Sequence, residues 1–133
     1  MKLNRISAVT LFVNDMNNSC GFYSRIPGFT LTYSSKNFTT FTLGDNIGKQ
    51  THLNLELANQ DILFDNRLKD FGRIIFHADN VDALYCYLNN DDSFSKLIII
   101  ESKPENAKWG ERYFHVRDPD GYQLSFAQPL KEL

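Results

Sequence analysis

The chain has 133 residues, of which 42% are hydrophobic and 23% are charged, values typical of one folded globular domain. Its net charge is −2 at pH 7 and no basic block occurs, which argues against nucleic-acid or anionic-membrane partners recognised through charge. There is no apolar signal region, and the longest apolar run, 97–100, is too short to span a bilayer. We therefore expect a cytoplasmic protein without a membrane partner.

The first half of the chain, about 1–60, alternates between strand and helix patterns. Asp15 suits a helix N-cap because its short side chain can accept a hydrogen bond from a free amide of the first turn. Gly28 suits the turn that leaves the helix. The patterns predict a strand near 5–14, a helix near 16–26, and strands near 28–34, 37–43 and 51–58.

The second half, about 70–133, repeats the first after a linker at about 59–70. Residues 8–13 match 73–78 at a shift of 65, and residues 55–58 match 124–127 at a shift of 69. Asn80 suits the second N-cap. An apolar stripe follows it at the helical spacing, formed by Val81, Leu84, Tyr85 and Leu88. The predicted elements are a strand near 72–78, a helix near 81–90, strands near 96–102, 111–117 and 122–128, and a loop over a cavity mouth at 102–108.

Residues 112–127 carry the most informative local pattern of the chain. Asp118 opens a tight turn, Pro119 presets the backbone angle φ at its second position, and Gly121 supplies the left-handed geometry at its end. Alternating residues on both sides predict two half-buried strands joined as a hairpin.

This hairpin, together with residues 22–29 and 110–112 and the βαβββ order of each half, resembles the vicinal oxygen chelate superfamily. That superfamily includes glyoxalase I, extradiol dioxygenases and bleomycin-resistance proteins. The resemblance implies an α+β fold, with two βαβββ modules (about 1–60 and 70–133) forming facing half-barrels around a central cavity in a single domain, 1–133. It also implies outer helices and a homodimer.

In metal-using members, four cavity-facing positions on the first and last strand of each module hold a metal. The resemblance carries these positions onto Ala8, Glu56, Arg73 and Ser125. Alanine has no donor atom, a neutral serine hydroxyl is a weak ligand, and arginine would place a positive charge at the cation's site. We therefore expect no metal and no cofactor. Glu56 and Arg73 are expected to meet as an ion pair; the alternative is that both are solvated.

Strand alternation predicts further cavity residues. Trp109 either stacks on a ligand or fills core space. Alternation places all three histidines on the cavity side. They could form a shifted metal site, supply an acid-base group, or be hydrogen-bonded residues at strand ends. The predicted cavity residues are Thr10, Phe12, His52, Asn54, Glu56, Arg73, His77, Trp109, Tyr113, His115, Gln123 and Ser125.

Two cysteines, Cys20 and Cys86, are expected as buried, reduced core thiols. The pattern favours a small-molecule-binding protein without the usual metal centre, sequestering a drug or metabolite. The alternative is a glyoxalase-like lyase, an isomerase or a dioxygenase that uses a shifted metal site or a metal-free acid or base, with Glu56 or a histidine as the candidate catalytic group. A regulatory domain with an empty cavity is a third possibility.

Overall fold

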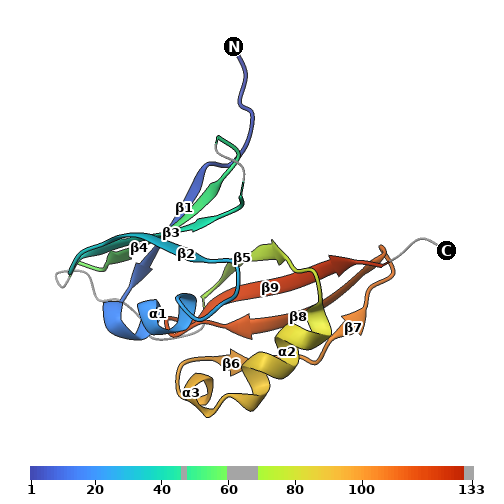
Figure 1. The fold of residues 1–133 in the computed structure, drawn as a ribbon. Helices are drawn as coiled ribbons and strands as arrows, with labels where there is room; N and C mark the ends of the chain where they lie inside the picture. The colour runs from blue at the N-terminus through green and yellow to red at the C-terminus, as the bar shows by residue number, and fades with distance from the viewer. Residues whose placement is uncertain (46–47, 60–68, 131–133) are drawn as a thin grey trace. The chain divides into compact units, whose positions relative to one another are not determined.

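The computed structural model describes residues 1–45, 48–59 and 69–130, which fall into two compact units, Met1–Asp65 and Asn66–Leu133 (Figure 1). Each unit is a mixed α/β layer with one sheet, which confirms the α+β class; the sheets are not closed into a barrel. The single domain and the cavity between the modules stay predictions. No helix among the described residues is long and apolar enough to cross a membrane.

The first unit follows the predicted βαβββ order. Its sheet has the strand order β1-β4-β3-β2, with β1 parallel to β4 and the other pairs antiparallel. Helix α1 packs against β3 and β4. It begins after Asp15, whose side chain accepts a hydrogen bond from the Asn18 amide, as predicted. The elements are β1 (Ala8–Val13), α1 (Met16–Tyr23), β2 (Thr30–Ser34), β3 (Phe38–Leu43) and β4 (Thr51–Leu57).

The second unit has the same order with two additions. Its sheet runs β5-β9-β8-β6, and the short strand β7 also pairs with β8. Helix α2 packs against β8 and β9 and is capped by Asn80, as predicted (Figure 1). The elements are β5 (Lys69–His77), α2 (Val81–Asn90), α3 (Asp92–Ser95), β6 (Ile99–Ile100), β7 (Glu105–Asn106), β8 (Glu111–Arg117) and β9 (Tyr122–Pro129).

Three expectations for the second unit need correction. Helix α3 and strand β7 were not predicted, and the strand expected over 96–102 covers only two residues. Both additions are too short to show a periodic pattern. The linker expected over 59–70 ends earlier, because β5 already includes Lys69 and Asp70; residues 60–68 lie outside the described part of the chain.

The predicted hairpin turn is confirmed. The Gly121 amide donates to the Asp118 carbonyl at 3.0 Å, and Gly121 has a φ of 89°, in the left-handed region. The Asp118 Oδ1 atom accepts from the amides of Asp120 and Tyr122 at 2.9 and 3.0 Å. Asp118 is only 4% exposed, so its carboxylate replaces water as the partner of these amides.

The two units repeat each other with a different offset in their last strands. In the first unit, Ala8 pairs with His52. In the second unit, Arg73 pairs with Gln123. Arg73 lies 65 positions after Ala8, but Gln123 lies 71 positions after His52. The offset between the paired positions of the last strands therefore differs by two residues from the sequence shift of 69. An alternating strand looks the same after a slip of two residues, because every side chain stays on its own face.

The cysteine expectation holds only in part. Both thiols are free, Cys20 is half-buried beside Thr39, and Cys86 is exposed. Cys86 was expected in the core, but it lies on α2 away from the stripe that includes the buried Val81 and Leu88.

Candidate functional site

In the first unit, strand alternation divides the sheet into a helix-covered face and an open face. Leu11 and Val13 are buried on the helix-covered face. Hydrogen-bonded neighbours in a sheet point the same way, so the register places Ala8, Thr10 and Phe12 on the open face with their partners on β4. The predicted residues of this unit therefore share one face: Thr10, Phe12, His52, Asn54 and Glu56.

Polar side chains on this face bond to one another. The Thr40 hydroxyl donates to the Asn54 Oδ1 at 2.8 Å, and the Asn54 Nδ2 donates to the Thr10 hydroxyl at 3.3 Å. The His52 Nδ1 lies 2.9 Å from the Thr42 hydroxyl. This arrangement fixes the orientation of Asn54 and His52 on the face.

Glu56 lies between two aromatic side chains. Its register partners are Phe12 on β1 and Phe38 on β3. Beside it is an open groove of about 520 Å³. The groove is lined by Asn37, Phe38, Glu56, Leu57, Ala58 and Asn59.

In the second unit, the same rule places the predicted residues on one face. Arg73, Ile75 and His77 pair with Gln123, Ser125 and Ala127 on β9. These in turn pair with Arg117, His115 and Tyr113 on β8. Ser125 is on this face but only 3% exposed, because larger neighbours flank it.

Trp109, Tyr113 and His115 form an aromatic row along β8. The rings of Trp109 and Tyr113 stack at 5.9 Å between centroids with 23° between planes, and those of Tyr113 and His115 are 5.1 Å apart. Trp109 is 71% exposed and so does not fill the core of its own unit; stacking on a ligand stays a prediction.

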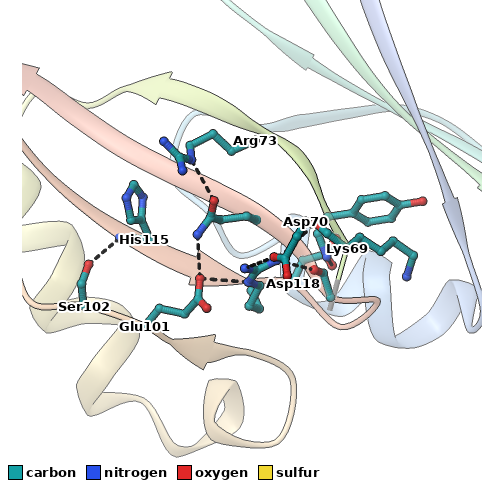
Figure 2. A network of polar contacts seen from close by, with 11 residues as sticks. Lys69, Asp70, Arg73, Glu101, Ser102, His115 and Asp118 are labelled. Carbon is teal, nitrogen blue, oxygen red and sulfur yellow. Dashed lines mark hydrogen bonds and ion pairs between the residues drawn. The ribbon is translucent and has the colours of Figure 1, made fainter. Parts of the chain in front are cut away.

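A chain of polar contacts crosses the open face from Arg73 to the strand ends (Figure 2). The Arg73 Nε donates to the Gln123 Oε1 at 2.8 Å, and the Gln123 Nε2 donates to the Glu101 Oε1 at 2.9 Å. The same Glu101 oxygen lies 2.9 Å from the Arg117 Nε. The Arg117 Nη2 donates to the Asp70 Oδ1 at 2.6 Å.

Arg117 was missed from the sequence, although it is the most buried charge of this network. Its side chain is 7% exposed, and its Nη1 also donates to the carbonyls of Lys69 and Gly121 at 3.2 Å. Burial lowers the pKa of Arg117, but the hydrogen bond to Asp70 and the ion pair with Glu101 outweigh it and hold the pKa above its ordinary value. Its place on the open face of β8 follows from alternation with Tyr113 and His115, which was the available signal.

His115 is the histidine whose environment is most distinctive. Its backbone amide donates to the Ser102 hydroxyl at 3.0 Å, while its ring Nδ1 is buried without a partner among the described residues. Burial lowers the pKa of His115, and the charges of Arg73 and Arg117 lower it further against the opposing carboxylates of Glu101 and Glu105. The ring is therefore neutral at pH 7.

This lowered pKa predicts a pH dependence of stability. The folded state binds the proton on His115 less tightly than the unfolded chain does. The contribution of His115 to the free energy of unfolding is therefore fully present above pH 6.5 and is lost as pH falls through the folded pKa. Stability should fall with decreasing pH by at most about 1.4 kcal/mol per pH unit from this residue. Urea unfolding between pH 5 and 7.5 should show a shallower slope in His115→Gln than in the parent. Equal slopes would contradict the prediction.

The predicted histidines do not form one cluster within a unit. His115 neighbours Ser125, and His77 lies at the end of β5 beside Ala127, 4.0 Å from the Asp79 carboxylate. In the parts of the chain that the structure describes, no three His, Cys, Asp or Glu side chains are grouped as metal ligands.

Comparison with known proteins identifies the fold. The pattern of the Glyoxalase/Bleomycin resistance protein/Dioxygenase superfamily matches residues 5–126. The chain belongs to this superfamily. No curated protein matches the chain.

Three solved structures with different names have folds similar to this chain. A glyoxalase-related enzyme from Fulvimarina pelagi has a TM-score of 0.72 and 16% identity, covering 95% of this chain and 88% of its own. Lactoylglutathione lyase from Agrobacterium tumefaciens has a TM-score of 0.67 and 18% identity, covering 96% and 95%. An antibiotic binding protein from Streptomyces has a TM-score of 0.66 and 22% identity, covering 97% and 98%. At these identities the likeness shows the fold alone.

The pairing register and the sequence shift of 69 match Ser125 with different residues of the first unit. With the offset of 71, Ser125 corresponds to Asn54, and Glu56 corresponds to Ala127. Glu56 also pairs with Phe12, four residues or about 13 Å along β1 from Ala8. The ligand positions that the resemblance implies, Ala8, Glu56, Arg73 and Ser125, therefore do not share one offset between the units. They offer one carboxylate, one hydroxyl and a cation, a donor set that fits a divalent metal poorly.

Proposed function

We propose that this chain binds a small organic molecule on the open faces of its sheets, without a divalent metal at the superfamily's ligand positions. The set that supports this most is Ala8, Glu56, Arg73 and Ser125, which the resemblance carries onto those positions and which includes a single strong metal-ligand side chain, Glu56. A metal-free binder needs shape, aromatic walls and a few placed polar groups, which these faces offer. The antibiotic binding protein from Streptomyces has the same fold.

A metal-free acid-base reaction is the second candidate. The observation in its favour is His115, whose ring is neutral at pH 7 and whose buried Nδ1 has no partner among the described residues. Glu56, between Phe12 and Phe38, is the other candidate base. The ion pair between Glu56 and Arg73 stays a prediction, and a ligand carboxylate would be an alternative partner of the Arg73 guanidinium.

Metal content and ligand binding test the proposal together. Protein purified without chelators should contain well below one divalent metal per chain by elemental analysis. Native mass spectrometry should reveal a co-purified organic ligand, and adding that ligand back to refolded protein should raise the melting temperature. About one zinc, nickel, iron or manganese per chain, lost in Glu56→Ala, would contradict the proposal and favour a metalloenzyme.

We also propose a cytoplasmic homodimer. Exposed apolar side chains on the strands, such as Phe12, Leu31 and Ile75, would be shielded in a closed two-fold assembly, and two free thiols suit a reducing compartment. Sedimentation equilibrium at micromolar concentration should give twice the 15.4 kDa mass of the chain. A species of 15.4 kDa alone would contradict the dimer.

A further inference from the structure

We infer that the open face of the second unit recognises a carboxylate carried by a flat aromatic molecule, with Arg73 binding the acid group and Trp109 and Tyr113 contacting the ring. This inference rests on the proposed small-molecule binding and names the chemical class of the ligand.

The first observation is that Arg73 differs from the two other arginines of this sheet. Arg117 is buried and paired with Asp70 and Glu101, and Arg112, on the opposite face, contacts the Asp82 carboxylate at 2.9 Å. Arg73 is exposed, and its Nε donates a hydrogen bond to a neutral amide, that of Gln123. Within the described residues no carboxylate pairs with it, so both terminal amino groups of its guanidinium can receive a carboxylate side by side.

The second observation is that the orientation of Arg73 is fixed. The Gln123 amide must present its oxygen to Arg73, because its nitrogen donates to Glu101. Glu101 is in turn fixed by the buried Arg117. Such a relay holds the guanidinium in place before a ligand arrives, which reduces the entropy lost on binding.

The third observation is the surface next to this cation. Figure 2 shows the side chains of Arg73 and His115 on the same side of the sheet. Burial lowers the pKa of His115, and the charge of Arg73 lowers it further. The imidazole therefore stays neutral and does not supply a competing cation. From His115 the row continues through Tyr113 to the exposed Trp109, a flat surface for a ring.

Charge along the row sets the direction of the ligand. The Tyr113 hydroxyl donates to Glu105 at 2.8 Å, and the Trp109 Nε1 donates to Glu111 at 2.7 Å. These carboxylates would repel an acid group at the Trp109 end. The acid is therefore placed at Arg73 and the ring toward Tyr113 and Trp109.

The test compares 2-naphthoate with its uncharged isostere 2-naphthamide by titration calorimetry on the full chain. Naphthoate should bind about tenfold or more tightly than the amide, and 0.5 M salt should weaken the naphthoate complex alone. Arg73→Gln should lose about 10- to 100-fold in naphthoate affinity with little change for naphthamide. Arg112→Gln, which removes the same charge from the other face of the sheet, should bind naphthoate like the parent.

Two further variants separate the parts of the site. Gln123→Met keeps the Arg73 charge but removes its orientation, so it should weaken naphthoate less than Arg73→Gln does. Trp109→Ala should weaken both compounds. Circular dichroism and urea unfolding of each variant establish that it is folded before the affinities are compared.

Equal affinity for the two compounds, no effect of Arg73→Gln, or no binding of naphthoate at millimolar concentration would overturn the inference. A co-purified ligand that is cationic or lacks an acid group would also overturn it while leaving the proposed binding function intact. A stoichiometric metal would instead contradict the proposed function, whatever the naphthoate result.

Discussion

Replacing Arg117 with alanine is expected to lower the free energy of unfolding by about 3 kcal/mol. The arginine side chain is 7% exposed and contacts Asp70, Glu101 and two backbone carbonyls. Without it, Glu101, which is 26% exposed, has lost its ion-pair partner. The buried carbonyl of Gly121 has also lost the hydrogen bond from the Arg117 Nη1. The cost stays below the top of the range for buried pairs because Asp70, 72% exposed, regains water.

Urea unfolding followed by circular dichroism measures this change. Arg112→Ala is the matched control, since it lies on the same strand and contacts Asp82 on the other face with greater exposure. The control should be much closer to the parent. Equal losses in the two variants would show that the burial of Arg117 is not what makes its contacts important.

Asp118→Ala is expected to destabilise the protein by about 2 kcal/mol. One carboxylate oxygen accepts from two backbone amides in the turn between β8 and β9, and the residue is 4% exposed. Alanine leaves the amides of Asp120 and Tyr122 without this acceptor at a site that water reaches poorly. Thermal unfolding should show a clear fall in the melting temperature.

Asp118→Asn is the informative comparison for this turn. An asparagine carbonyl at the same position can accept from the same two amides, so most of the lost stability should return. If asparagine is as damaging as alanine, the negative charge matters more than the acceptor geometry, and the explanation of the turn given above is wrong.

Local chemistry made several features of this protein predictable from the sequence. Asp15 and Asn80 cap their helices because a short polar side chain can bond to an amide three residues later, a contact that depends on neighbouring residues alone. The turn at Asp118 and Gly121 follows from side-chain and φ preferences in the same way. Alternation also predicted which strand residues share one face of the sheet in each unit.

The register and the burial of individual side chains were decided by the tertiary structure. Alternation has a period of two, so it cannot fix the register of the last strand of each unit against the first; the hydrogen-bonded pairings of β1 with β4 and of β5 with β9 fix it. The exposure of Cys86 and Trp109 depends on which side of their elements meets the sheet. Arg117 is buried where Asp70, Glu101 and the carbonyls of Lys69 and Gly121 converge on it, whereas Arg73 on the same face is exposed.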